Sequence, residues 1–232
     1  MSFNFKGFIL VVFVFLFGSS LIYKFYPERK YKNIIFDLGN VLFEWCPEKY
    51  AREIFKPEEH ESLDLLIKQV SDFLVENDWR NLDCGLINES QFIKQLSHKY
   101  SNLKIEYLLK NVHQYLTPIK DGLLILEKIK KKKYNTYIIS NFPKDVFDKI
   151  FLNNDFLKGF DGMIISSHVN LVKPDSKIYK TFLGKYNLDP SECLFIDDLK
   201  ENIHGAKSCG IDGIICSDHK ILFDELKRKR IL

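Results

Sequence analysis

The sequence predicts an α/β fold with a doubly wound, parallel, Rossmann-like sheet that begins near Asn33. Short apolar runs recur along the chain, and segments with helical periodicity separate them. Three polar residues, Asp37, Ser140 and Asp197, each come at the carboxyl end of an apolar run. Because ligands of doubly wound sheets bind beyond the carboxyl ends of the strands, these residues also predict where the functional site lies.

The elements follow one another in the order expected for such a sheet. Apolar runs predict strands at residues 34–36, 137–139, 163–166, 193–196 and 213–216, and periodic segments predict helices at 121–132, 143–151, 177–186 and 202–209. No strand is apparent between Trp45 and Thr117, where the pattern predicts helices at 47–55, 58–76, 88–100 and 105–115. We therefore expect an α/β core of residues 33–45 and 117–232, with an inserted helical cap of residues 46–116 over the site.

Residues 1–32 form a separate region. Residues 7–23, GFILVVFVFLFGSSLIY, carry no charge, which predicts an N-terminal hydrophobic helix that anchors the chain in a membrane, followed by a linker. Basic residues follow this segment more densely than they precede it, which places the main domain on the cytoplasmic side. A cleaved signal with export of the domain is the alternative, because Gly18, Ser19 and Ser20 are small residues of the kind found at cleavage sites.

Composition excludes several classes of protein. With 34 basic and 31 acidic residues the net charge is +3, and the runs 130–133 and 227–230 are interpreted as solvated helix ends, so we expect no nucleic-acid partner. The 46% hydrophobic content suffices for a buried core. Five cysteines without a C-x-x-C pair argue against a disulfide framework or a zinc site.

The stretch LFIDDLKENIHGA carries the strongest single motif. Asp197 and Asp198 are adjacent carboxylates after a buried strand, and they repel each other unless a cation or hydrogen-bond donors lie near. A hard cation such as Mg²⁺, bound by oxygen ligands, is the economical explanation. Asn202, at a predicted helix start, could orient a carboxylate or a ligand water.

Three other strand ends supply the remaining candidates. Asp37 follows the first strand, Ser140 and Asn141 end the second, and Lys173 precedes Pro174 in a later loop. Taken singly, each residue is typical of a turn, a helix cap or an exposed loop. At one edge of a parallel sheet, Ser140 and Asn141 could offer hydrogen-bond donors to an anion, and Lys173 could supply a fixed positive charge for a phosphoryl group.

The four stretches FDLGNVLF, IISN, VKPDSKIY and FIDDLKENIHGA, in this order, resemble the motifs of the haloacid dehalogenase-like hydrolase superfamily. The resemblance covers the chain from about Asn33 onward. The segment DWRNLDCGLINESQF is similar to the cap segment of sugar-phosphate-type and phosphoglycolate-type members.

The resemblance implies a role for each candidate. Asp37 would be the nucleophile that forms an aspartyl-phosphate. Magnesium would be held by Asp37, the backbone carbonyl of Gly39, Asp197 and Asp198. The phosphoryl group would be bound by Ser140, Asn141 and Lys173, with Asn202 in support.

Gly39 is the departure from the pattern. Most phosphatases of this superfamily carry there a second aspartate, which protonates the leaving group and activates water. Three interpretations stay open: a phosphatase of an activated substrate such as a sugar phosphate, a 2-haloacid dehalogenase, or a binding module without activity. The first is favoured, because the D-L-G-N-V subset includes sugar-phosphate phosphatases. His168 and His204, near the motif loops, are candidates for the missing acid, whereas Trp79 is interpreted as cap core and Arg80 as a surface residue.

Overall fold

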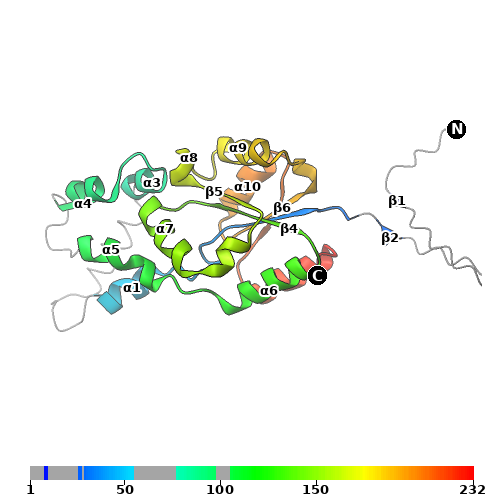
Figure 1. Ribbon diagram of the computed structural model, residues 1–232, viewed down its shortest axis with the longest axis horizontal. Coiled ribbons are helices and arrows are strands. Elements are labelled where there is room, and N and C mark those ends of the chain that lie inside the picture. Colours follow the sequence, from blue (N-terminus) through cyan, green and yellow to red (C-terminus); the bar gives the residue numbers. More distant parts are fainter. Residues whose placement is uncertain (1–7, 10–25, 28, 55–76, 98–104) are drawn as a thin grey trace, which may run out of the picture.

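The computed structural model describes residues 8–9, 26–27, 29–54, 77–97 and 105–232 (Figure 1). The helix predicted at 58–76 lies outside these residues, as do residues 98–100 of the helix predicted at 88–100. Most of the hydrophobic segment 7–23 also lies outside them.

The centre of the molecule is a five-stranded parallel sheet with the spatial order β5 (Gly162–Ile165), β4 (Asn135–Ser140), β3 (Asn33–Phe36), β6 (Cys193–Asp197) and β7 (Asp212–Ile215). Phe36 of β3 pairs in register with Ile138 on one side and with Ile196 on the other. The chain therefore continues to opposite sides of β3, and the carboxyl end of β3 is the switch point where a ligand site is expected. The predicted doubly wound sheet is confirmed.

Helices cover both faces of this sheet, because alternate side chains along each strand point to opposite faces. Ile34 and Phe36 contribute to one core cluster and Ile35 to the other. The first cluster packs against α6 (Lys120–Lys131), α7 (Lys144–Asn153) and α11 (His219–Arg228). The second packs against α9 (Ser176–Tyr186) and α10 (Lys200–Ser208). Figure 1 shows the two helix layers above and below the sheet.

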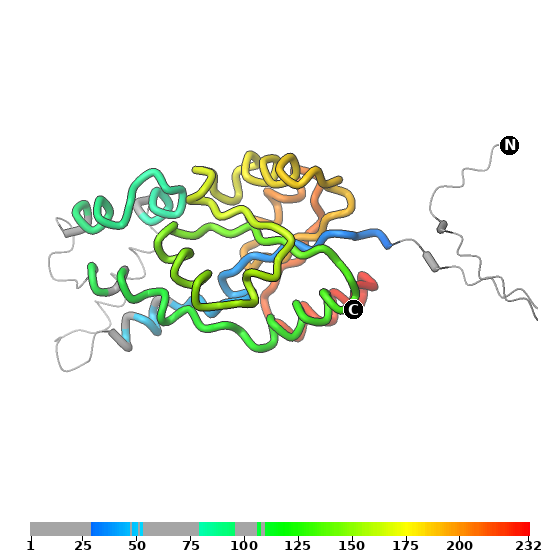
Figure 2. Tube along the Cα trace, viewed as in Figure 1, coloured from blue at the N-terminus to red at the C-terminus, as the bar shows by residue number. Residues whose placement is uncertain are grey.

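In the described part of the chain between β3 and α6 there are four further helices: α1 (Pro47–Ile54), α3 (Asn77–Asp83), α4 (Glu89–Ser97) and α5 (Ile105–Tyr115). We call them the inserted helices. They gather at one end of the molecule, beyond the carboxyl ends of the strands (Figures 1 and 2). Helix α3 was not predicted, because NDWRNLD is mostly polar and only Trp79 and Leu82 give it a buried side.

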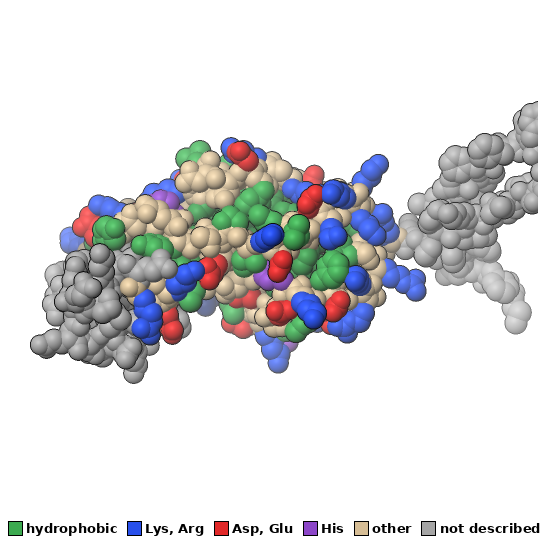
Figure 3. All heavy atoms as spheres, turned by 90° about the horizontal axis from the view of Figure 1, so that it is seen from below, with side chains coloured by type: hydrophobic (Ala, Val, Ile, Leu, Met, Phe, Trp, Pro, Cys, Tyr) green, Lys and Arg blue, Asp and Glu red, His purple; other side chains and the backbone are tan. Residues whose placement is uncertain are grey.

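Two strands end one residue earlier than the sequence predicts: β7 stops at Ile215, before Cys216, and β5 stops before Ser166. Ser166 was assigned to a strand, but β5 stops at Ile165 and Ser166 begins the one-turn helix α8 (Ser166–Val169). The basic runs end α6 and α11, where Lys131 pairs with Glu127 and Arg228 with Glu225. Figure 3 shows acidic and basic side chains interspersed on the face seen from below.

At the N-terminal side, β1 (Phe8–Ile9) pairs antiparallel with β2 (Tyr26–Pro27). In the part of the chain that the structure describes, no helix has the length and apolar character needed to cross a bilayer. Residue 7 and residues 10–23 of the predicted anchor fall outside that part. The N-terminal helix, the membrane anchor and the cytoplasmic placement therefore stay predictions, as does the alternative of export.

Candidate active site

The carboxyl ends of three neighbouring strands bring the predicted site residues together. Asp37 directly follows β3, Ser140 ends β4 and Asp197 ends β6. One carboxylate oxygen from each of Asp37, Asp197 and Asp198 lies within 4.8 Å of the others. Three carboxylates at this spacing form a set of oxygen donors that a hard divalent cation such as Mg²⁺ favours.

Lys173 is the fixed positive charge of the site. Its buried Nζ lies 2.8 Å from Asp37 Oδ1 and 2.6 Å from Asp197 Oδ2. Burial alone would lower the pKa of Lys173, but the two carboxylates outweigh it and raise the pKa, so the ammonium stays charged. The side chain of Asn141 holds this loop, since its Oδ1 accepts from the Lys173 backbone N–H (2.8 Å) and its Nδ2 donates to the Lys173 carbonyl (3.1 Å).

Asp37 is buried at the base of the site. The Ser140 hydroxyl donates to Asp37 Oδ1 over 2.7 Å. Burial raises the pKa of Asp37 to about 7, against the opposing effect of Lys173 and with further contributions from Asp197 and Asp198. A bound cation favours the ionised form of a carboxyl group, so a cation held by these carboxylates would lower the pKa of Asp37.

The two adjacent acids face different surroundings. Asp197 is fully buried, and its Oδ1 accepts from Asn202 Nδ2 and from the Leu199 backbone N–H, each over 2.9 Å. Its other oxygen accepts from Lys173. Asp198 is half-buried and lines the open cavity beside Asp37. Asp198 is thus the acid of the pair with access to a ligand.

Asn40 belongs to this site and was missed. Its backbone has a φ of 52°, a left-handed conformation that asparagine tolerates better than most residues. Its Nδ2 donates to Asp198 Oδ2 over 3.0 Å, and its Oδ1 accepts from the Trp45 backbone N–H over 3.0 Å. The available signal was its place directly after glycine in the turn of FDLGNV.

A cavity of about 320 Å³ opens from these acids toward the inserted helices. Its polar residues are Asp37, Asn40, Asp83, Ser140, Asn141 and Asp198, and Gly39 lines it as well. The rest of the lining is apolar: Trp45, Trp79, Val112, Leu116, Phe142, Pro143, Val146 and Leu199.

Two of the predicted roles of cap residues can be compared with this cavity. Trp79 is buried and packs against Phe92, as expected of a core residue, but it also lines the cavity with its ring centroid 5.9 Å from that of Trp45. Arg80 is exposed and does not line the cavity.

Asp83, the last residue of α3, is the second site residue that the sequence interpretation missed. Its side chain lines the same cavity as Asp37, and its buried Oδ1 has no hydrogen-bond partner among the described residues. Burial raises the pKa of Asp83 to about 8, with an opposing effect of Lys173 and a smaller contribution of Asp37. The only signal in the sequence was an acid two residues before Gly85 in DWRNLDCG.

Neither histidine proposed for the missing acid lies at the site. His168, on α8, has its ring against Phe147 and its Nε2 3.7 Å from Asp148 Oδ1. His204 is exposed on α10. Because neither residue lines the cavity of Asp37, the interpretation of either one as the acid is wrong.

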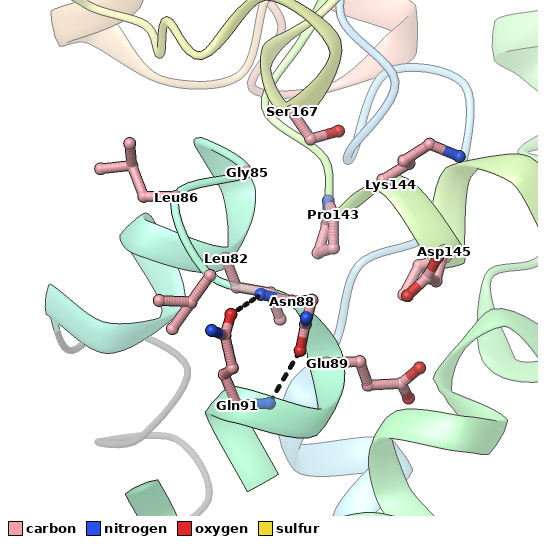
Figure 4. Close-up of a pocket in the computed structure, with 12 residues that line it drawn as sticks. Leu82, Gly85, Leu86, Asn88, Glu89, Gln91, Pro143, Lys144, Asp145 and Ser167 are labelled. Carbon is pink, nitrogen blue, oxygen red and sulfur yellow. Dashed lines mark hydrogen bonds between the residues drawn. The ribbon is translucent and has the colours of Figure 1, made fainter. Parts of the chain in front are cut away.

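A second cavity, of about 250 Å³, adjoins the first and shares Pro143 and Val146 with it. Figure 4 shows it between the segment that joins α3 to α4 and the start of α7. Reciprocal hydrogen bonds fix that segment, because Asn88 N–H donates to Gln91 Oε1 and Gln91 N–H donates to Asn88 Oδ1, each over 2.9 Å.

Comparisons with known proteins agree with this geometry. The family model for haloacid dehalogenase-like hydrolases matches residues 34–216. Sesquiterpene phosphatase astK of Aspergillus oryzae is 23% identical over 200 residues, which cover 85% of this chain and 96% of that protein. A phosphorylated carbohydrates phosphatase of Thermotoga maritima is 27% identical over 125 residues, which cover 50% of this chain and 58% of that protein. In drimenol cyclase drtB of Aspergillus calidoustus, 25% identical over 203 residues, the match spans only 35% of the protein.

Solved structures share the fold. A haloacid dehalogenase-family enzyme of Bacteroides thetaiotaomicron, in complex with magnesium and inorganic phosphate, has a TM-score of 0.63 at 22% identity, with 83% of this chain and 99% of that chain covered. An L-2-haloacid dehalogenase of Xanthobacter autotrophicus has a TM-score of 0.61 at 18% identity, with 87% and 84% covered. On the match of the family model, which spans most of the chain, this protein belongs to the haloacid dehalogenase-like hydrolase family.

Proposed function

We propose that this protein is a magnesium-dependent phosphomonoesterase that hydrolyses a small phosphorylated metabolite through an aspartyl-phosphate on Asp37. The observation that carries the proposal is the placement of Lys173 between Asp37 and Asp197, with Asp198 facing the same cavity. Fixed charges of this kind would stabilise a transferring phosphoryl group. The phosphatases among the relatives support the reaction class.

The carboxylates fit a magnesium ion. Asp37, Asp198 and the backbone carbonyl of Gly39 would hold it, with Asp197 behind them. Bound magnesium would neutralise charge on the phosphoryl oxygens. Asp197 has both of its oxygens occupied by Lys173, Asn202 and Leu199, so we assign it to positioning Lys173 and, through water, to the ion.

The remaining residues orient and stabilise the phosphoryl group. Lys173 supplies a permanent positive charge, and the Ser140 hydroxyl, which donates to Asp37 in the free site, would donate to a phosphoryl oxygen. Asn141 was predicted to bind phosphate directly. Because its side-chain amide is engaged by the backbone of Lys173, we assign it instead to fixing that residue.

The lining of the cavity supports a substrate with an apolar body. Beyond the acids, the leaving group would contact Trp45, Trp79, Val112, Leu116 and Phe142, which offer few partners for sugar hydroxyls. The sesquiterpene phosphatase relative fits this chemistry. A sugar phosphate, expected from the sequence, is the second candidate, and the carbohydrate phosphatase relative favours it.

Two other functions are weaker. A 2-haloacid dehalogenase needs no metal, so the cluster of three acids counts against it although the fold is shared. A binding module without activity would have no need of a buried nucleophile paired to Lys173.

Phosphate release by the full chain tests the proposal, with magnesium or with EDTA. The substrates are a sesquiterpenyl monophosphate, glucose 1-phosphate, acetyl phosphate and p-nitrophenyl phosphate. We expect magnesium-dependent turnover that Asp37→Asn abolishes and that Asp224→Asn, at an exposed carboxylate on α11, leaves unchanged. Halide release from 2-chloropropionate without magnesium would favour the dehalogenase, and binding of every phosphate without turnover would favour the binding module.

A further inference from the structure

Gly39 leaves the proposed reaction without a proton donor at the usual position. A Cβ built on Gly39 would meet only the Trp45 Cβ, at 3.8 Å, and the glycine has no left-handed φ that would demand it. Among the described residues, the position therefore has room for a Cβ. Loss of an alkoxide from phosphorus requires a proton, so the acid must come from elsewhere in the cavity.

We propose that Asp83, at the end of α3, is the general acid and base of the proposed phosphatase reaction. It would take the role of the aspartate that most phosphatases of the family carry at the position of Gly39. Among the described residues of the inserted helices, Asp83 is the one whose carboxyl group lines the cavity of Asp37. The proposal rests on the proposed function and names the residue that completes it.

The side chain of Asp83 lies at the wall of the cavity in which a substrate would bind. Its Oδ1 is buried, lacks a partner among the described residues, and belongs to a side chain that lines the cavity. A buried polar atom without a partner is costly to the fold, and such atoms are rare unless a ligand or a function accounts for them. The leaving-group oxygen of a substrate in the cavity would supply the missing partner.

Three contacts fix the main chain around Asp83 to the core. The Ser166 hydroxyl accepts from the Phe142 backbone N–H and donates to the carbonyl of Asp83. The Asn170 side chain donates to the Cys84 carbonyl over 2.9 Å. Gly85 has a φ of +69°, and a Cβ there would lie 2.6 Å from the Ser167 carbonyl oxygen, so only glycine permits this close approach.

Ser166 also relates Asp83 to the phosphate-binding loop. Phe142 follows Ser140 and Asn141 directly, so one hydroxyl group contacts both that loop and the turn that carries Asp83. This placement gives the carboxyl group a defined position relative to Asp37, as a proton donor requires.

The charges around Asp83 suit proton transfer near neutral pH. Burial raises its pKa to about 8, and Asp37 on the β3 side adds to this while Lys173 opposes it. An acid with a pKa near the working pH holds a proton in the resting enzyme and releases it readily.

The proposed sequence of steps conserves protons. Asp37 attacks phosphorus, the bond from phosphorus to the leaving oxygen breaks, and that oxygen takes the proton of Asp83. The Asp83 carboxylate then removes a proton from water as the water attacks the phosphorus of the aspartyl-phosphate. Phosphate leaves, Asp37 returns as a carboxylate, and Asp83 is protonated again.

Leaving-group dependence tests the proposal. Asp83→Asn keeps the shape of the side chain but cannot transfer a proton. We expect kcat/KM for a simple alkyl phosphate to fall by about 10²–10⁴-fold, the usual contribution of general acid catalysis. For p-nitrophenyl phosphate, whose leaving group needs no proton, we expect a loss of less than about 10-fold. An equal loss with both substrates, or none with the alkyl phosphate, would overturn the proposal.

Two further variants separate proton transfer from a structural effect. Glu89→Gln is the matched control, because Glu89 Oε1 is also buried without a partner among the described residues but lies in the adjoining cavity. We expect it to leave the ratio between the two substrates unchanged. Gly39→Asp in the Asp83→Asn background places an acid in the open space at residue 39 and should restore part of the alkyl phosphate turnover; failure to do so in a folded variant would count against proton loss as the defect.

The two proposals fail in different ways. If the unaltered protein releases no phosphate from p-nitrophenyl phosphate with magnesium, the proposed function falls and the role of Asp83 falls with it. If it does release phosphate and Asp83→Asn leaves both rates unchanged, only the role of Asp83 falls.

Discussion

Two clusters of charged residues lie at opposite ends of the same sheet, and they shift the pKa values of their acids in opposite directions. At the amino end of β7, Asp212 accepts from the Tyr31 hydroxyl, from Lys229 Nζ over 3.0 Å and from the Gly213 backbone N–H over 2.8 Å. Burial acts against ionisation there, but these donors outweigh it and lower the pKa of Asp212. The fold favours the charged form of this acid, and the acid in turn stabilises the fold.

At the carboxyl end of the sheet, the surroundings of the acids disfavour their ionised form. The pKa values of Asp37, Asp83 and Asp198 are all raised, chiefly by burial, and Lys173 offsets only part of this. Strained electrostatics of this kind are typical of functional sites, where stability is lost in return for reactivity. The amino-end cluster is thus the structural one, and the carboxyl-end cluster is the candidate for chemistry.

The largest contrast is expected from removing the lysine of each cluster. Lys173→Met leaves Asp37 and Asp197 buried without their cation, so we expect the free energy of unfolding to fall by about 3–5 kcal/mol. Lys229→Met, at a partly exposed pair, should cost at most about 1 kcal/mol. Urea unfolding of both variants at pH 7 measures the difference, and equal losses would contradict the distinction between the clusters.

Replacing Asp83 should stabilise the protein at alkaline pH. Its raised pKa means that the folded state keeps a proton that the unfolded chain has lost between pH of about 4 and pH of about 8, so stability falls across that window. Asp83→Asn removes this effect, and we expect a gain of about 2 kcal/mol at pH 9. This is less than half of what about 1.4 kcal/mol per pKa unit would give between 3.8 and about 8, because residue 83 is only half-buried and solvent screens its charge. The gain should vanish below pH of about 4. Thermal unfolding across this range would refute the expectation if the variant were less stable at pH 9.

Asp212→Asn should show the opposite dependence and the smallest effect. Because the folded-state pKa is lowered, the stabilisation by Asp212 is present above the unfolded pKa of about 4 and is lost as the pH falls through the folded value. We expect the variant to lose about 1 kcal/mol at pH 7, with the difference shrinking in acid. The same thermal scans test this, and a loss that stays constant down to pH 2 would point to packing in place of charge.

The sequence predicted the sheet and most of the site because both depend on local patterns. Buried strands read as apolar runs, and Asp37, Ser140 and Asp197 stand directly at their ends. Lys173 was found through its motif, although no local pattern shows that it pairs with two acids.

The rest depends on contacts between distant segments. Asp83 has an ordinary helical neighbourhood, and only the docking of residues 83–85 on α8 brings it to the cavity of Asp37. The different surroundings of Asp197 and Asp198 likewise follow from Lys173, Asn202 and Asn40, which are remote or unpatterned in the sequence. Helix α3 was missed because its apolar residues are too few to set a period.

The two hydrogen bonds of the Ser166 hydroxyl have a consequence for how a protein of this kind evolves. It joins two pieces of chain that are far apart in the sequence, one with the residues proposed to bind phosphate and one with the carboxyl group proposed to donate the proton. If proton supply and substrate choice reside on the same exchangeable segment, then swapping residues 77–97 between family members would alter both traits in a single event. The loop that carries Asp37 lies outside residues 77–97, so the exchange would leave it unchanged.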